Sequence, residues 1–285
     1  MSSTSLTSNA LQAFKTNKIA LFSAVYLALL FVLALLTPWL APYSYDTQNL
    51  ALGASPPSQL HWLGTDIFGR DMLTRLMYGS RISLFVGVIA TAVALGIGVT
   101  YGAIAGFVGG RLDALMMRIV DILYALPFVI FVVLLMVVFG RNIYLLFLAI
   151  GAIEWLTMAR IVRGQVSTLK QRPFVQAAFT AGFSRSTVLI KHILPNALGP
   201  VIVYTTLTIP SVMLLEAFLS FLGLGIQPPQ ASWGSLISDG VENMEAYPWV
   251  LIGPALCLSV TLFALNFVGD GLRDAFDPQS AKGQA

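Results

Sequence analysis

The sequence predicts an all-α integral membrane protein with six transmembrane helices and both termini in the cytoplasm. Of the 285 residues, 57% are hydrophobic and only 10% are charged, and the mean hydropathy is +0.81. A soluble domain carries about a quarter charged residues, so most of this surface must face lipid. In addition, six apolar runs approach or exceed the roughly 20 residues that cross a bilayer core of about 30 Å.

The six runs give the expected crossings in order. They lie at about residues 19–40, 82–108, 119–140, 143–163, 197–226 and 248–269. The first run is longer than the apolar part of a signal peptide, so we expect an uncleaved helix. Five glycines of the second run suggest a face for close helix packing: Gly87, Gly96, Gly98, Gly102 and Gly106. Pro127 predicts a kink in the third helix, while Pro200 and Pro210 predict a tilted or broken fifth helix.

Basic residues give the orientation. With both termini inside, the cytoplasmic segments hold Lys15, Lys18, Arg111, Arg118, Arg160, Arg163, Lys170, Arg172, Arg185, Lys191, Arg273 and Lys282. The outer loops hold only Arg70, Arg75, Arg81 and Arg141. Because cytoplasmic loops are enriched in basic residues, we expect a cytoplasmic tail at residues 1–18, a membrane domain at 19–269 and a second cytoplasmic tail at 270–285.

The outer loop at residues 41–81 is expected to end in a short amphipathic surface helix at about residues 69–80. Asp71 precedes Arg75 by four residues, the spacing of a helical ion pair. Asp66, Arg70 and Asp239 could contact an outer partner, although solvated surface charge is the simpler interpretation for each of them.

The cytoplasmic loop at residues 164–195 is too long and too polar for a simple turn. Four of its residues recur at helical spacing and predict one small apolar face of a short helix: Phe174, Ala177, Ala178 and Ala181. Gly182 permits a sharp turn, after which we expect a second short helix from about residue 186 to 194, before Pro195. Such a projection could dock another protein, and the alternative is an interfacial helix on anionic lipid.

The sequence lacks the residues for several other kinds of site. A single cysteine, Cys257, excludes an intrachain disulfide, and two distant histidines, His61 and His192, cannot form a zinc cluster. No GxSxG nucleophile elbow is present, which argues against a hydrolase. The net charge of +3 is spread too thinly to follow a nucleic acid backbone. We therefore expect no catalytic residue, no metal and no nucleic acid partner.

The cytoplasmic loop also resembles a known motif. The sequence QAA at residues 176–178 is followed by Gly182 and then by HILP at residues 192–195. This order is similar to the EAA loop of binding-protein-dependent ABC transporter permeases, usually written as EAA, then G, then IxLP. Gln176 replaces the usual Glu, and His192 stands where an Ile is common. Residues 61–84, 218–240 and 266–278 resemble further signatures of the dipeptide and oligopeptide permeases, most like the oligopeptide-permease C subunits.

This resemblance implies the type I ABC importer permease fold in the inner membrane of a bacterium. It also implies a homologous permease B subunit, two ABC ATPase subunits, an extracytoplasmic peptide-binding protein and a peptide substrate as partners. None of the lysines in this chain follows a glycine, as the phosphate-binding lysine of a Walker A loop must. ATP and Mg would therefore bind to the ATPase subunits, and this chain would be non-catalytic and bind no cofactor.

The resemblance assigns the contact with an ATPase subunit to one part of the loop. The residues are Phe174, Val175, Gln176, Ala177, Ala178, Ala181, Gly182, Phe183 and Ser184, with Leu194 and Pro195 at the end of the loop. Glu154 and Glu216 interrupt predicted crossings and are candidates for the translocation path, because burying a charge in a membrane is costly. A structural role is the alternative, such as an ion pair between Glu154 and Arg160.

Other functions stay open at this point. An ion-coupled secondary transporter would use Glu154 and Glu216 to carry protons. An assembly protein would use the basic loop to recruit a cytoplasmic partner. Within the ABC class, the cargo could be dipeptides, nickel chelates, glutathione or antimicrobial peptides instead of oligopeptides.

Overall fold

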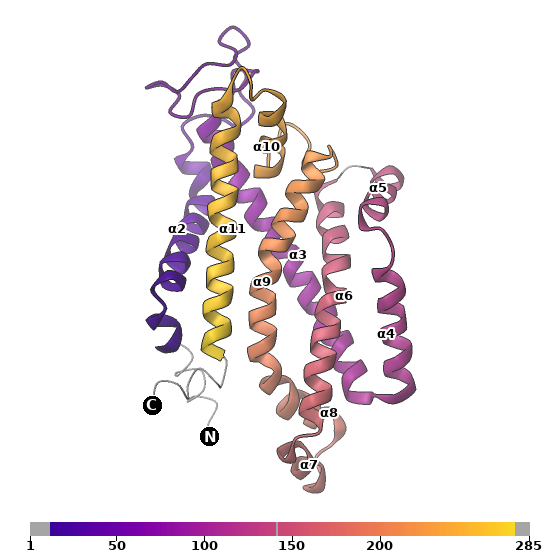
Figure 1. The fold of residues 1–285 in the computed structure, drawn as a ribbon. Coiled ribbons are helices and arrows are strands. Elements are labelled where there is room, and N and C mark those ends of the chain that lie inside the picture. The colour runs from indigo at the N-terminus through magenta and orange to yellow at the C-terminus, as the bar shows by residue number, and fades with distance from the viewer. Residues whose placement is uncertain (1–11, 141, 277–285) are drawn as a thin grey trace.

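A computed structural model describes residues 12–140 and 142–276, and within them every regular element is a helix (Figure 1). The long helices are α2 (Lys18–Leu40), α3 (Met72–Val108), α4 (Gly110–Tyr124), α5 (Phe128–Phe139), α6 (Ile143–Lys170), α9 (Leu194–Phe221) and α11 (Pro248–Phe276). The short ones are α7 (Pro173–Thr180), α8 (Arg185–Thr187), the π-helix η1 (Val188–Ile193) and α10 (Trp233–Glu242). Residues 1–11 and 277–285 of the predicted tails, with Lys282, lie outside the described residues, as does Arg141.

The long helices lie side by side in an elongated bundle (Figure 1). α7 and α8 project from the end at which α2 begins and α11 ends, which we call the α7 end. The segment between α2 and α3, together with α10, lies at the opposite end, which we call the α10 end. The bundle therefore presents two differently built ends, separated by apolar helices.

Five helices, α2, α3, α6, α9 and α11, are long and apolar enough to cross a membrane. α4 and α5 qualify only as a pair, bent by 79° at the break between them. Pro127 is the N-cap of α5 and has no N–H for a continuous helical ladder. The segment predicted as one kinked helix at residues 119–140 is therefore two helices, and the first of them begins at Gly110. The chain is a multi-pass, all-helical membrane protein with five or six candidate spans.

The separate surface helix predicted at residues 69–80 is wrong, because most of these residues form the first turns of α3. Asp71 is the N-cap of α3, and its side chain accepts a hydrogen bond from the Thr74 N–H at 2.8 Å. No residue with positive φ interrupts the helix before Gly109, where φ is +74°. The predicted start at residue 82 marks only the end of the charged residues, which a helix outside the membrane core tolerates.

Three other helix boundaries also differ from the prediction. α6 continues to Lys170 and α11 to Phe276, past the predicted ends at 163 and 269, because the helices extend beyond their apolar parts. α9 ends at Phe221, before the predicted 226. Gly223 has a φ of +73°, and the Leu224 N–H donates to the carbonyl five residues earlier at 2.8 Å, as in a Schellman cap.

The short helix predicted to end at residue 194 is also wrong, because the chain stays helical from Arg185 to Phe221. The π-helix η1 comes immediately before α9, and Pro195 lies in the first turn of α9. Pro195 has no N–H to donate to an α-helical ladder. A change of hydrogen-bond register at this point allows the helix to continue through the proline.

Glycines bring α3 and α6 into close contact. A Cβ on Gly102 would lie 2.4 Å from the carbonyl oxygen of Ala159, and one on Gly106 would lie 2.5 Å from that of Arg163. Gly98 is similarly crowded by α6, with a Cβ position 2.6 Å from the Met158 side chain. Side chains at these positions would force the helices apart, so the predicted close packing is confirmed for these three glycines.

The two remaining glycines of the predicted face behave differently. A Cβ on Gly87 would lie 3.1 Å from the side chains of Ile209 and Met213, so this glycine packs on α9. A Cβ on Gly96 would meet nothing within 4 Å. The prediction is therefore wrong for Gly96, which faces open space.

Candidate coupling surface and membrane carboxylates

The helix α7 has clear boundaries. Pro173 lies in its first turn, where the missing proline N–H costs no hydrogen bond. At the other end, the N–H groups of Gly182 and Phe183 donate to the carbonyls of Phe179 and Ala178 at 3.0 and 3.2 Å. Gly182 has a φ of +83°, so these bonds form a Schellman cap, and the sharp turn predicted at this glycine is confirmed.

One side of α7 is buried inside the chain. Val175 and Ala178 join an apolar cluster with Val166 of α6 and with Val188 and Ile193 of η1. The prediction placed Ala178 on one face with Phe174, Ala177 and Ala181. It is wrong for Ala178, because this residue is buried on the other side of α7. Val175, Ala178 and Phe179 form a second apolar stripe on α7. Burying this stripe removes more apolar area from water than burying Phe174, Ala177 and Ala181 would.

The other side of α7 is exposed. Phe174 keeps 43% of its surface exposed, and Ala177 and Ala181 are also exposed. Phe183 follows the turn and is 49% exposed. These four residues make an apolar surface at the tip of the α7 end, which we call the α7 tip.

The rest of the predicted contact segment supports this tip. Ser184 is the N-cap of α8, and its Oγ accepts a hydrogen bond from the Thr187 N–H at 3.3 Å. Leu194 is half-buried in the apolar cluster beneath α7, whereas Pro195 is exposed. The structure therefore brings part of the segment from 174 to 184 into one cluster with residue 194, while the assignment of these residues to an ATPase contact stays a prediction.

Gln176 connects α7 to the end of α6. Its side-chain amide Nε2 donates to the carbonyl of Lys170 at 3.0 Å. Lys170 is the last residue of α6, so its carbonyl has no acceptor role within that helix. An ionised glutamate, the usual residue of the EAA motif, has no hydrogen to donate. The amide is therefore suited to holding α7 against α6 in a way that a carboxylate is not.

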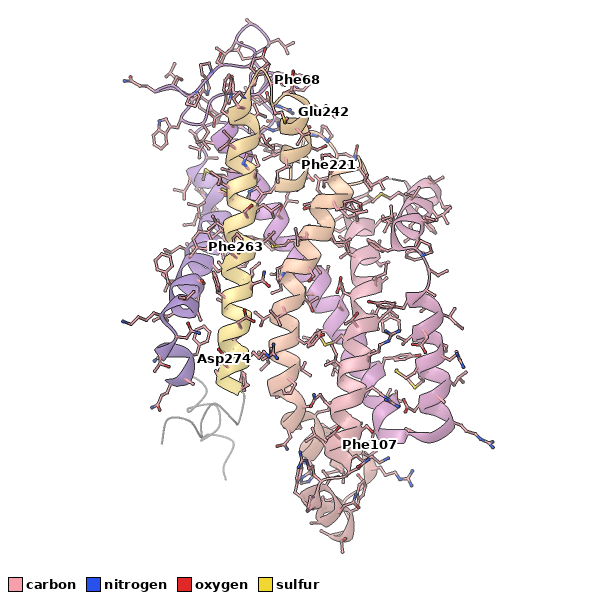
Figure 2. The ribbon with its side chains drawn as sticks, in the orientation of Figure 1. Phe68, Phe107, Phe221, Glu242, Phe263 and Asp274 are labelled. Carbon is pink, nitrogen blue, oxygen red and sulfur yellow. The ribbon has the colours of Figure 1, made fainter. Side chains whose placement is uncertain are left out.

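Sequence reasoning missed a second anchor of α7, at the end of α3. The rings of Phe107 and Phe179 stack with their centroids 6.4 Å apart. Lys170 Nζ donates to the carbonyl of Phe107 at 2.5 Å and lies 5.5 Å from the centroid of its ring. Figure 2 labels Phe107 at the end of the bundle where α7 projects. The helix α7 is thus fastened to both α3 and α6.

Two ion pairs join α4 to α6. Asp113 accepts hydrogen bonds from the guanidinium of Arg163 through both carboxylate oxygens. Arg160 Nη2 donates to Asp121 Oδ1 at 2.8 Å. The alternative that pairs Glu154 with Arg160 is therefore wrong in this conformation, because Arg160 binds Asp121.

The two membrane carboxylates lie in different surroundings. Glu216 is only 1% exposed, and its Oε1 accepts hydrogen bonds of 2.6 Å from both Ser220 Oγ and Ser232 Oγ. Ser232 is the N-cap of α10, so Glu216 joins α9 to α10. Glu154 is half-buried in α6 and forms no hydrogen bond or ion pair with any described residue. No contact within residues 12–140 and 142–276 brings the two carboxylates together.

A buried ionic network holds the α10 end. Asp66 Oδ2 accepts hydrogen bonds of 2.7 Å from Arg70 Nε and from Arg75 Nη1. All three side chains are almost fully buried, while Asp239 of α10 is 48% exposed and lies 3.4 Å from Arg75. The interpretation of Asp66 and Arg70 as solvated surface charges is therefore wrong, and Arg75 pairs with Asp66 rather than with Asp71.

The segment between α2 and α3 is held at two places, by the N-cap of α3 and by the buried ionic network around Asp66. Asp71 accepts from Thr74 and lies 2.9 Å from His61 Nδ1. The indole N–H of Trp249, near the start of α11, donates to the carbonyl of Thr65 at 3.0 Å. Within the described residues, no group of three or more His, Cys, Asp or Glu side chains is arranged to hold a metal ion.

Comparison with known proteins places these features in a family. Residues 98–282 match the family described as binding-protein-dependent transport system inner membrane component. Residues 5–57 match the N-terminal TM domain of oligopeptide transport permease C. The oligopeptide transport system permease protein OppC of Haemophilus influenzae is 50% identical over 277 residues, covering 96% of this chain and 89% of the relative.

Two proteins of Bacillus subtilis are similar over the same extent. Its oligopeptide transport system permease protein OppC is 47% identical over 280 residues, covering 98% of this chain and 92% of the relative. Its dipeptide transport system permease protein DppC is 46% identical over 278 residues, covering 97% and 87%. These matches confirm the resemblance carried by the loop around Gly182, and the chain belongs to the family of binding-protein-dependent transport system inner membrane components.

Proposed function

We propose that this chain forms one half of the translocation path of an ATP-driven oligopeptide importer, and that the α7 tip is its contact with an ATPase subunit. The observation that carries the proposal is the two-sided construction of α7. One side is fastened to α3, α6 and η1, while the other presents Phe174, Ala177, Ala181 and Phe183 to a partner. A helix of this kind can transfer a displacement from a bound protein to the membrane helices.

The energy for transport would come from other subunits. Members of this family are non-catalytic membrane subunits, and ATP hydrolysis lies in separate chains. We assign ATP and Mg to two ABC ATPase subunits, and the other half of the path to a homologous permease B subunit. Hydrolysis can act on this chain only through a contact whose geometry differs between two states.

Oligopeptides are the cargo that the relatives support. Two of the similar proteins are named oligopeptide permeases and one is named a dipeptide permease. Peptides share a backbone and two charged termini, so a wide path can accept many sequences while an extracytoplasmic peptide-binding protein selects among them. Asp239 and the exposed apolar residues of the outer segment, such as Trp62, are available for contact with that protein.

We also propose six crossings with both termini in the cytoplasm of a bacterial cell, in its inner membrane. This count treats α4 and α5 as one broken span. A cysteine introduced at Ser184 should react with a membrane-impermeant thiol reagent only after the cells are opened. A cysteine introduced at Glu242, on α10, should react in intact cells, and the reverse pattern would contradict the orientation.

The coupling contact is tested by Phe174→Ala in the assembled transporter. Loss of this exposed ring should reduce ATP-driven uptake of labelled di-, tri- and pentapeptides by roughly tenfold, as for an interface hot spot. Phe139→Ala is the matched control, because Phe139 is 68% exposed at the other end of the bundle. Unchanged uptake by the Phe174 variant would refute the contact. Uptake driven by a proton gradient in vesicles without ATP would instead support an ion-coupled transporter.

A further inference from the structure

A groove runs between the first turns of α2 and the middle turns of α11, two helices that lie side by side in Figure 1. It has a volume of about 380 Å³. Its walls include Phe22 of α2 and Val260, Phe263 and Phe267 of α11, and Lys18 lies at its end. Figure 2 labels Phe263 about midway along α11. Nothing in the function of the α7 tip uses this groove.

The wall of the groove is mostly apolar, with Ser23 and Tyr26 as the polar uncharged residues along it. Tyr26 lines it, and its hydroxyl forms a hydrogen bond of 3.1 Å with the Thr261 hydroxyl. The two hydroxyls therefore satisfy each other. Three phenylalanine rings and aliphatic side chains make up most of the remaining wall, so an extended apolar chain can bury apolar surface along the groove.

The length of the groove fits an acyl chain. Lys18 and Tyr26 are eight residues apart on one helix, which corresponds to about 12 Å. This length approaches the depth of one leaflet, about half of a 30 Å hydrocarbon core.

Lys18 gives the groove a charged end. It is exposed at the first position of α2, and no carboxylate of the described residues forms an ion pair with it. Among the described residues before and at the start of α2 and in the last turns of α11, the charged ones are Lys15, Lys18, Asp270, Arg273 and Asp274. Their formal charges sum to +1. An apolar channel of leaflet depth that ends at a cation matches a phosphate headgroup joined to a fatty acyl chain.

We propose that this groove is a binding site for an anionic phospholipid, with one acyl chain between α2 and α11 and the phosphate at the Lys18 ammonium. The groove shares no residue with the α7 tip, so this site is distinct from the proposed ATPase contact.

The test is native mass spectrometry of the purified importer complex in detergent, with phosphatidylglycerol or phosphatidylethanolamine added in equal amounts. We expect one phosphatidylglycerol to be retained in preference to phosphatidylethanolamine. Lys18→Gln should lower the retained fraction about fivefold, the factor that one basic residue near an anionic membrane surface contributes. Lys15→Gln removes the same charge outside the groove and should leave retention unchanged.

A second pair of variants tests the acyl-chain wall. Phe263→Ala should lower retention severalfold, whereas Leu256→Ala, which truncates an exposed apolar residue of the same helix outside the groove, should not. The proposal is overturned if the complex retains no lipid, if Lys18→Gln binds as the unchanged protein does, or if both lipids bind equally. It is also overturned if a cysteine at Phe22 cross-links efficiently to the second permease subunit, because a protein would then occupy the groove.

Discussion

The close approach of α3 and α6 makes a quantitative prediction for Gly102→Ala. The new Cβ would lie 2.4 Å from the carbonyl oxygen of Ala159 and 3.0 Å from the Arg163 backbone nitrogen. Ordinary contact begins near 3.4 Å, so the helices must separate by about 1 Å at this point. A gap of that size removes roughly a quarter to a half of each dispersion contact that it opens.

The expected cost follows from these contacts. Overpacking of a well-packed interface destabilises by about 1–3 kcal/mol, and the rigid backbone around Ala159 places Gly102→Ala at the upper end of this range. Gly96→Ala is the matched control, because its Cβ meets nothing within 4 Å. There, replacing glycine in a helix should stabilise by about 0.5–1 kcal/mol. The two variants should therefore differ by roughly 3 kcal/mol in the free energy of unfolding.

Thermal unfolding of the detergent-purified protein, followed by circular dichroism, measures this difference. At about 2–4 °C per kcal/mol for a large domain, the unfolding midpoint of Gly102→Ala should lie well below that of Gly96→Ala, by about 5 °C or more. Equal midpoints for the two variants would show that α3 and α6 do not pack through Gly102, and the described arrangement of these helices would then be refuted.

Three further predictions concern the two ends of the bundle. Gly182→Val places a β-branched residue at a φ of +83°, which distorts the turn after α7. The variant should insert into the membrane but take up less peptide per ATP hydrolysed. An unchanged ratio of uptake to hydrolysis would count against a role for the turn. Gln176→Glu removes the donor to the Lys170 carbonyl, so faster proteolysis at α7 is expected, and equal protease resistance would show that this bond does not hold the helix. Arg75→Ala should lower the free energy of unfolding by about 3 kcal/mol, and with it the melting temperature, because it breaks a buried ion pair with Asp66. Arg81 forms no ion pair with a described residue, so Arg81→Ala should have little effect on the melting temperature.

The sequence predicts the membrane helices well where one physical property decides the outcome. The first crossing, expected at residues 19–40, is observed at Lys18–Leu40, because an apolar run of this length has few other stable states. The family could also be predicted, since the spacing of QAA, Gly182 and HILP is local in sequence. The turn at Gly182 follows from the conformational freedom of glycine.

Other features depend on contacts that the sequence order does not reveal. Asp66 and Arg70 look like surface charges, and their burial depends on Arg75, which also reaches Asp239 far along the chain. The stack of Phe107 on Phe179 likewise joins residues from two distant segments. The start of α3 could not be predicted from charge-free runs, because its first turns contain charged residues. Asp71 is nevertheless a local signal for this start, since an aspartate before a helical pattern is a common N-cap.

These long-range contacts give α3 a particular place in the bundle. At about 1.5 Å per residue, α3 runs roughly 48 Å from Arg75 in the buried ionic network to the stacked ring of Phe107. Along this length, its glycines lock it to the backbone of α6, which ends at the same α7 helix. A displacement of α7 must therefore either carry α3 and α6 together or separate the rings of Phe107 and Phe179. Because packed interfaces have discrete stable arrangements rather than bending continuously, the first outcome moves the α10 end as well. If an ATPase binds the α7 tip as proposed, these contacts would give it a direct mechanical route to the α10 end.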